Sequence, residues 1–273
     1  MTITAGRMGL VWMASMGVVL AILAGLWVLG ERAVSNRLAS VQTLVIGTSL
    51  VRYGIPDPEG RSLATAFGPA PLLRLGYSGA SEEQLFAITA MAARHGVQRL
   101  GIEVNPIVSR FAFKAQGCGL AGWIKHHFIA MRRTFRAAVT GQDVMANALA
   151  RPPDQDQPRV VDEEVLTRLY PLRLTGSCSA DRWATLFAAH PDMQVVLIAM
   201  PRAPVARDRI GTDGMAKFNA AARQFATATG MQLFIVDPEG TWPTDAFIDQ
   251  GHMSPEGSAR FIAGLAAYAS KLP

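Results

Sequence analysis

An uninterrupted apolar run near the start of the chain is the strongest constraint on its fold. Residues 8–30 form a stretch of 23 residues without a charged side chain. At about 1.5 Å per residue, a helix of this length reaches roughly 34 Å, which is enough to cross a bilayer core of about 30 Å. A cleaved signal peptide has a shorter apolar region and a small-residue cleavage site, and residues 31–35 are a poor one. The run therefore predicts one uncleaved transmembrane signal anchor.

The anchor divides the chain into parts of very different length. We interpret residues 1–7 as a cytoplasmic tail and the polar residues 31–42 as a linker. Residues 43–273 are enough for one α/β domain. Flanking charge orients the anchor weakly, but a short tail ahead of a large body favours the body outside. The prediction is a single-pass protein of the inner (cytoplasmic) membrane with its domain in the periplasm or another extracytoplasmic space.

Charge and cysteine content are compatible with that location. The formal net charge is +5, which can favour an anionic membrane surface or an anionic polymer. The basic residues are spread along the chain, which is more typical of a solvated surface. No nucleic-acid partner is expected. Cys118 and Cys178 are the two cysteines, and they either pair in an oxidising compartment or remain buried thiols. The adjacent His126 and His127 would point about 100° apart on a helix, so they make a poor metal pair. No metal site is expected.

Short apolar segments alternate with helical segments along the rest of the chain. Strands are predicted at residues 43–46, 73–79 (a strand or a loop), 99–104, 194–199 and 232–236. Helices are predicted at residues 81–95, 123–139, 181–190, 212–229 and 255–271. Strands that alternate with helices pair in parallel, which predicts a three-layer α/β/α sandwich with a central parallel sheet. Residues 107–178 interrupt this alternation and are interpreted as an insertion or lid.

Two short motifs lie where such a sheet binds its ligands, beyond the carboxyl ends of the strands. Ser49 follows Gly47 directly after the first predicted strand, a position that alone is more typical of a turn or a helix cap. Asp249 lies three residues before His252, just ahead of the last predicted helix. A serine nucleophile needs an adjacent base and a carboxylate that holds the tautomer of that base. The three side chains are therefore a candidate Ser-His-Asp triad, with Asp237 as an alternative acid.

The order of these motifs resembles that of the SGNH hydrolases, also called GDSL hydrolases. That family has a glycine in a loop after the second strand, which Gly79 matches, and an asparagine after the third strand, which Asn105 matches. The resemblance runs from Thr43 to the carboxyl terminus and leaves out the middle insertion. Two blocks depart from the family pattern. Thr48 stands where Asp is frequent, and residues 103–106 read Glu-Val-Asn-Pro where the family has Gly-x-Asn-Asp.

The resemblance implies acyl transfer through a covalent serine ester, with no metal and no organic cofactor. It implies that His252 takes the proton of Ser49 and that Asp249 orients His252. The implied oxyanion donors are the backbone N–H groups of Ser49 and Gly79 and the side chain of Asn105.

The single anchor followed by Gly-Thr-Ser resembles the membrane-anchored branch of this family, which modifies cell-envelope polymers. That branch includes proteins of alginate and cellulose acetylation and of teichoic-acid D-alanylation. It implies a polysaccharide substrate and, as partner, a membrane-bound O-acyltransferase or a polysaccharide synthase complex. The prediction is a serine esterase or O-acyltransferase, most simply for acetyl groups. The alternative is a non-catalytic SGNH-like subunit that binds glycan or scaffolds such a complex, and a soluble lipase would require cleavage of the anchor.

Overall fold

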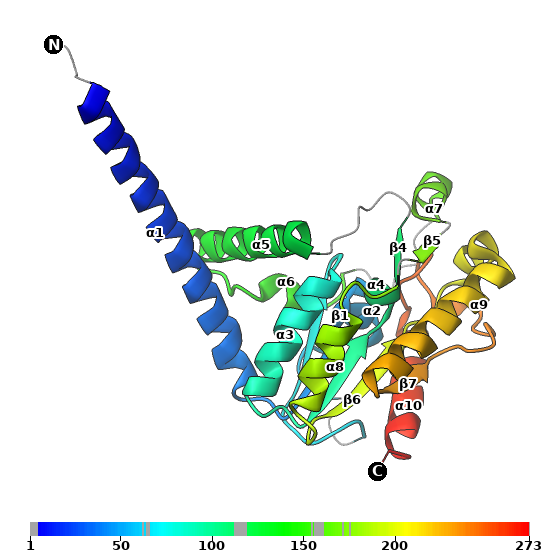
Figure 1. Ribbon diagram of the computed structural model, residues 1–273. Coiled ribbons are helices and arrows are strands. Elements are labelled where there is room, and N and C mark those ends of the chain that lie inside the picture. Colours follow the sequence, from blue (N-terminus) through cyan, green and yellow to red (C-terminus); the bar gives the residue numbers. More distant parts are fainter. Residues whose placement is uncertain are drawn as a thin grey trace.

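A computed structural model of the chain contains an α/β domain and one long helix that projects from it (Figure 1). The structure describes residues 5–61, 63, 66–111, 119–153, 155, 161–170, 172–174 and 176–272. Five strands pair in parallel in the order β2-β1-β3-β6-β7. They are β1 (Thr43–Thr48), β2 (Leu72–Tyr77), β3 (Arg99–Glu103), β6 (Gln194–Ala199) and β7 (Gln232–Ile235). The predicted central parallel sheet is confirmed.

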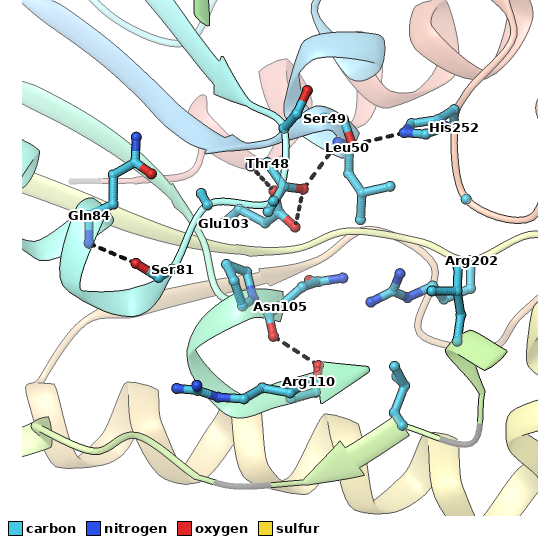
Figure 2. A pocket seen from close by; sticks show the side chains of 18 of the residues that line it. Thr48, Ser49, Leu50, Ser81, Gln84, Glu103, Asn105, Arg110, Arg202 and His252 are labelled. Carbon is cyan, nitrogen blue, oxygen red and sulfur yellow. Dashed lines mark hydrogen bonds between the residues drawn. The ribbon is translucent and has the colours of Figure 1, made fainter. Parts of the chain in front are cut away.

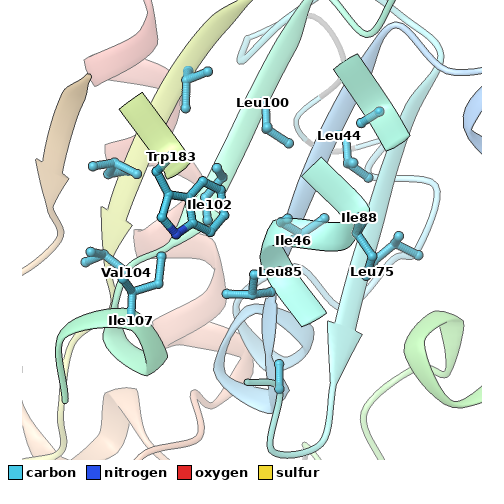
Figure 3. Close-up of a cluster of buried hydrophobic side chains, with 14 of the residues drawn as sticks. Leu44, Ile46, Leu75, Leu85, Ile88, Leu100, Ile102, Val104, Ile107 and Trp183 are labelled. Atoms are coloured by element: carbon cyan, nitrogen blue, oxygen red, sulfur yellow. The ribbon is translucent and has the colours of Figure 1, made fainter. Parts of the chain in front are cut away.

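Helices cover both faces of this sheet. One face packs against α3 (Glu82–Arg94), α8 (Ala180–Ala188) and α9 (Pro204–Thr229), and the other packs against α2 (Ser49–Gly54) and α10 (Pro255–Ala269). Successive strand residues point to opposite faces, so Leu44 and Ile46 join the first layer (Figure 3), whereas Val45 joins the second. Strands β1, β2, β3 and β6 are therefore buried at nearly every position rather than at alternate ones, and the edge strand β7 is half-buried.

The helix that projects from the domain, α1 (Ala5–Leu38), is longer than the predicted anchor. Residues 10–38 are long and apolar enough to cross a membrane. The first two thirds of the predicted linker at residues 31–42 are helical, because α1 continues through them. Residues 31–38 contain neither glycine nor proline, and Val34 and Leu38 lie one turn apart on the side that packs into the domain core.

The chain between β3 and β6 forms short elements and one long helix. The elements are α4 (Asn105–Val108), β4 (Ser109–Phe111), α5 (Gly119–Thr140), α6 (Ala146–Leu149), α7 (Glu163–Leu169) and β5 (Leu172–Leu174). Strands β4 and β5 pair in an antiparallel ribbon apart from the main sheet. The predicted insertion at residues 107–178 falls on these elements. The expected helix at residues 123–139 is confirmed as part of α5.

Helix α5 packs against α1 and α3 (Figure 1). Near the end of α1, the Thr134 side chain lies against Gly30, and the rings of Trp27 and His127 meet edge to face with centroids 5.4 Å apart. The outer surface of α5 is apolar and exposed. Its exposed large apolar side chains are Leu120, Trp123, Ile124, Phe128, Ile129, Phe135 and Val139.

Some helix boundaries follow local signals in the sequence, and others do not. Ser81 caps α3 by accepting a hydrogen bond from Gln84 N at 3.3 Å. Helix α9 begins eight residues before the predicted position, and Gly211 kinks it with φ 76° and ψ 160°. Only glycine adopts this backbone conformation readily, so Gly211 joins two helices that the sequence pattern separates. Of the two cysteines, Cys178 is disulfide-bonded, whereas Cys118 lies outside the described residues.

Candidate active site

The carboxyl ends of the parallel strands bring together residues that are far apart in the sequence. Ser49 follows β1, Gly79 follows β2 and Asn105 follows β3. Arg202 follows β6, and the loop at residues 249–252 follows β7. All of them line one cavity of about 600 Å³. Parallel strands end at a common edge, so the topology explains why these five segments meet.

Ser49, His252 and Asp249 form a continuous hydrogen-bonded chain. His252 Nε2 lies 2.8 Å from Ser49 Oγ (Figure 2), and His252 Nδ1 lies 2.7 Å from Asp249 Oδ2. The predicted contact of His252 with both partners is thus observed. Its two ring nitrogens serve different partners, which is the arrangement that a general base and its orienting carboxylate require.

The ionisation of Asp249 sets the tautomer of His252. Burial alone would raise the pKa of Asp249. Hydrogen bonds and charge from the His252 ring, together with the backbone N–H groups of His252 and Gly251, outweigh burial and leave this pKa below its ordinary value. An ionised carboxylate only accepts hydrogen bonds, so His252 Nδ1 carries the proton and donates it to Asp249. Nε2 is left as the acceptor for the Ser49 hydroxyl.

The Asp-x-x-His spacing is explained by the loop that these residues form. Asp249 Oδ1 accepts hydrogen bonds from the backbone N–H groups of Gly251 at 2.9 Å and His252 at 2.8 Å. The other oxygen, Oδ2, is then directed at the ring. Ile248 N donates to His252 O at 2.9 Å and closes the turn. One carboxylate therefore shapes the loop and orients the base.

Helix α10 supports this loop by close backbone contact. Ser254 N donates to Ala246 O at 3.0 Å, and the Ser254 hydroxyl caps α10 by accepting from Gly257 N at 3.1 Å. A Cβ atom on Gly257 would lie 2.0 Å from Ala246 O. Only glycine fits there, which explains the glycine two residues into the last helix.

An aromatic ring packs on the candidate base. The Tyr53 ring lies over His252 with centroids 4.3 Å apart and planes tilted by 33°. The Gln155 side chain donates to Tyr53 O at 3.0 Å and to Met253 O at 3.1 Å, which joins the chain after β1 to the histidine loop. These contacts restrict the rotation of the imidazole ring.

Glu103 is completely buried beneath the turn that carries Ser49. Its carboxylate accepts hydrogen bonds from Thr48 N at 2.6 Å and from Thr48 Oγ1 at 3.0 Å (Figure 2). A Cβ atom on Gly47 would lie 2.5 Å from Glu103 Oε2, so a glycine is needed here. Thr48 and Glu103 are both positions that depart from the SGNH family pattern, and in this chain they bind each other.

The buried carboxyl of Glu103 has a pKa above the ordinary value of a glutamate. Burial raises the pKa of Glu103 to about 7, although the two hydrogen bonds from Thr48 and the positive charge of Arg202 oppose this shift. The turn that carries Ser49 therefore rests on a group that changes its charge near neutral pH.

The candidate oxyanion donors line the cavity with Ser49. Gly79 has φ +69°, a conformation that favours glycine in the loop after β2. The Asn105 side chain is buried and bound to the chain after β6. Its Oδ1 accepts from Met200 N at 2.9 Å and its Nδ2 donates to Met200 O at 3.2 Å. The second N–H of Nδ2 is left for the cavity.

Other residues singled out in the sequence lie elsewhere or act differently. Asp237, the alternative acid, accepts from Arg207 at 3.2 Å and from the backbone of Thr241 and Trp242, so it stabilises the turn after β7. His126 lines the cavity, and burial lowers its pKa to about 4, so its ring is neutral near pH 7.

Sequence reasoning did not identify Tyr53, Glu103 or Arg202 as site residues. Two signals were present. Glu103 is a charged residue at the end of an otherwise apolar strand, and Arg202 stands just beyond the end of another. Tyr53 gives no such signal, because its contact with His252 joins segments that are 199 positions apart.

The sequence matches no family model and no curated protein. The functional assignment therefore depends on the geometry of the residues at the sheet edge.

Proposed function

We propose that the chain is a membrane-anchored serine esterase or O-acyltransferase of the SGNH hydrolase superfamily. The observation that carries this proposal is the pair of hydrogen bonds that joins Ser49 to His252 and His252 to Asp249. Their position beyond the carboxyl ends of parallel strands, with Gly79 and Asn105 in the same cavity, supports it.

The chemistry is acyl transfer in two steps. Ser49 Oγ attacks the carbonyl carbon of an ester while its proton passes to His252 Nε2, and the leaving alkoxide takes that proton from His252. Water or a sugar hydroxyl then attacks acyl-Ser49, with His252 again accepting and returning a proton. The N–H groups of Ser49, Gly79 and Asn105 Nδ2 stabilise the oxyanion, and one such donor contributes about 3 kcal/mol.

The proposed location is the outer face of the cytoplasmic membrane, with α1 as the anchor and the domain in the periplasm. Helix α5 supports this assignment, because it contacts α1 at Trp27 and Gly30, near the end of the apolar run. Its exposed Trp123 and Phe128 are of the kind that lie at a membrane–water interface. The proposed substrate is an acetylated polysaccharide of the cell envelope. The proposed partner is a membrane-bound O-acyltransferase or a polysaccharide synthase complex.

The decisive experiment is the hydrolysis of 4-nitrophenyl acetate by the full chain in detergent micelles and by its S49A variant. The full chain is required because Val34 and Leu38 of α1 pack into the domain core. We expect S49A to lower the rate by about 10³-fold or more. The S78A variant, which removes another serine of the same cavity, is the control and should keep the activity.

The outcomes separate the possible reactions. Equal rates for the unmodified chain and S49A would contradict the role of Ser49. A third outcome is that neither protein hydrolyses the ester, whereas the acetyl content of a cellular polysaccharide depends on Ser49. This outcome would identify a transferase.

A non-catalytic glycan-binding or scaffold subunit is the second candidate. The observation that favours it is the engagement of both ends of the Asn105 amide by Met200, which leaves one N–H of Asn105 for an oxyanion. This candidate predicts that S49A changes neither ester hydrolysis nor polysaccharide acetylation, whereas deletion of the protein changes the amount of polymer.

A further inference from the structure

Arg202 is a buried arginine of the candidate site that forms no hydrogen bond with any residue in the described part of the chain. Arg202 is only 5 % exposed and lines the cavity that contains Ser49 and His252. Its Nε atom is completely buried and has no partner among the residues that the structure describes. In Figure 2 the guanidinium points from the end of β6 toward Asn105.

A second buried arginine, Arg74, has a structural role, and the chain provides hydrogen-bond acceptors for its guanidinium group. Arg74, on β2, is completely buried and donates hydrogen bonds to the carbonyl oxygens of Ile55, Pro56, Ala148 and Ala150 at 2.5–3.1 Å. These bonds fasten α6 and the loop after α2 to the sheet. Arg202 has no comparable set within the described part of the chain. Leaving a buried N–H group without a partner is costly, so hydrogen bonds within the described part of the domain do not account for Arg202.

The nearest carboxylate does not satisfy Arg202. The charge of Arg202 acts on Glu103 across the cavity floor, but the two side chains form no ion pair among those of the described residues. Glu103 instead accepts both of its hydrogen bonds from Thr48. The terminal N–H groups of Arg202, which form no hydrogen bond with the described residues, therefore remain available to a molecule that enters the cavity.

The rest of the cavity adds to this positive charge. Arg110, Lys125 and Arg133 also line it, so four cationic side chains face two carboxyl groups among the described lining residues. Those carboxyl groups are Asp249, which is bound to His252, and Glu103, which has a pKa of about 7. The cavity therefore attracts anions.

We propose that Arg202 binds an anionic group of the substrate, a carboxylate or a phosphate, so that the polymer handled at this site is acidic. A guanidinium presents two parallel N–H groups that match the oxygens of either group. The acyl-transfer part of this inference rests on the proposed function, but the binding of the anion does not require Ser49 to react.

Binding measurements with the full-length S49A chain in detergent micelles test the proposal without catalysis. The probes are oligogalacturonate, the same oligomer with its carboxyl groups methyl-esterified, and a glycerol-phosphate oligomer. We expect an anionic oligomer to bind about 10-fold or more tightly than the esterified one. The R202Q substitution in the S49A background should abolish this preference. R223Q, which removes an exposed arginine of α9, should keep it.

The comparison of the two anionic oligomers identifies which kind of anionic group binds Arg202. A preference for oligogalacturonate that depends on Arg202 indicates a uronate, and the same preference for the glycerol-phosphate oligomer indicates a phosphodiester. The proposal is overturned by equal affinity for the charged and esterified oligomers, by an unchanged preference in R202Q, or by failure of both anionic oligomers to bind. Because the protein lacks the nucleophile, none of these results bears on whether Ser49 is catalytic.

A stability measurement separates ligand binding from a structural role. If Arg202 serves the substrate, R202Q removes an unsatisfied buried charge, and the melting temperature of the ligand-free protein should be unchanged or higher. R74Q removes a guanidinium with four carbonyl partners and should lower the melting temperature sharply. If the melting temperature of R202Q fell as far as that of R74Q, Arg202 would have a structural role.

Discussion

The candidate active-site cavity has two walls that are built differently. The wall at the sheet edge holds its polar groups by several contacts each, since Asp249 binds two backbone N–H groups as well as His252, and Glu103 binds Thr48 twice. The opposite wall is α5, which contributes Lys125 and Arg133 from a helix with an exposed outer surface. The first wall is suited to holding reacting atoms in place, and the second is suited to contacting a substrate.

The position of α5 connects substrate contact with the anchor. This helix packs on α1 while its inner side lines the cavity. A shift of α1 against the domain would therefore act on the helix that contributes Lys125 and Arg133. The difference between the walls suggests that variants of the sheet edge change chemistry and stability, and that variants of α5 change recognition.

The largest expected effect is a loss of activity on substitution of Asp249, in the wall at the sheet edge. D249N keeps the shape of the side chain but removes its charge, so His252 loses the partner that holds its tautomer. We expect kcat for 4-nitrophenyl acetate to fall by about 10³- to 10⁴-fold. D237N is the matched control, because Asp237 pairs with Arg207 in the turn after β7, and it should reduce stability rather than kcat. A larger loss of kcat in D237N than in D249N would overturn the assignment of the acid.

The next effect concerns the buried carboxyl under the nucleophile turn. The folded protein raises the pKa of Glu103 from 4.5 to about 7, so between these values the folded state holds more protons than the unfolded state. Stability should therefore fall as pH rises from about 5 to about 7 and then level off. E103Q should lack this decline, giving it a relative gain on the order of 2–3 kcal/mol between pH 5 and pH 8. Thermal unfolding of both proteins across this range measures the difference, and parallel pH profiles would disprove it.

A smaller effect tests the support of the histidine loop. G257A would place a methyl group on the carbonyl of Ala246, so α10 and the loop would have to separate. We expect a loss of about 2 kcal/mol in the free energy of unfolding, measured with denaturant. In G264A, from the same helix, the new Cβ would meet the tip of the Phe234 ring at 3.3 Å. That side chain can shift and alanine favours a helix, so G264A should stay within about 1 kcal/mol of the unmodified protein. Equal losses would show that Gly257 has no special role.

The smallest expected effect is a weaker binding of ligand when Lys125 of α5 is substituted. Lys125 is exposed at the cavity rim, so K125Q should weaken the binding of oligogalacturonate to the S49A protein by about 5-fold or less. Added salt should remove most of this difference, because exposed charges are screened. K271Q, at an exposed site near the end of the chain, is the control and should bind normally. A loss in K125Q that persists at high salt would place Lys125 in a less exposed contact than its position indicates.

The strands and the candidate triad could be predicted from the sequence because their signals are local. Buried strands are short apolar runs, and Asp249 and His252 are joined within one turn by hydrogen bonds of the carboxylate to the backbone. The extent of α1 could not be predicted in the same way. The polar residues 31–37 resemble a linker, and their helical state depends on the packing of Val34 and Leu38 against a domain that is distant in sequence.

By itself, the sequence determined an apolar helix, an alternating α/β chain and three side chains in the order of a serine triad. Only the tertiary structure decided which polar residues have partners. Arg74 and Arg202 both lie on or just beyond a buried strand. Residues 55–56 and 148–150 surround the first with carbonyl oxygens, whereas the buried Nε of the second has no hydrogen-bond partner among the described residues. Hydrogen bonding of a buried charge depends on groups brought from elsewhere in the chain. For this reason the difference between a structural arginine and a candidate substrate ligand is visible only in the folded protein.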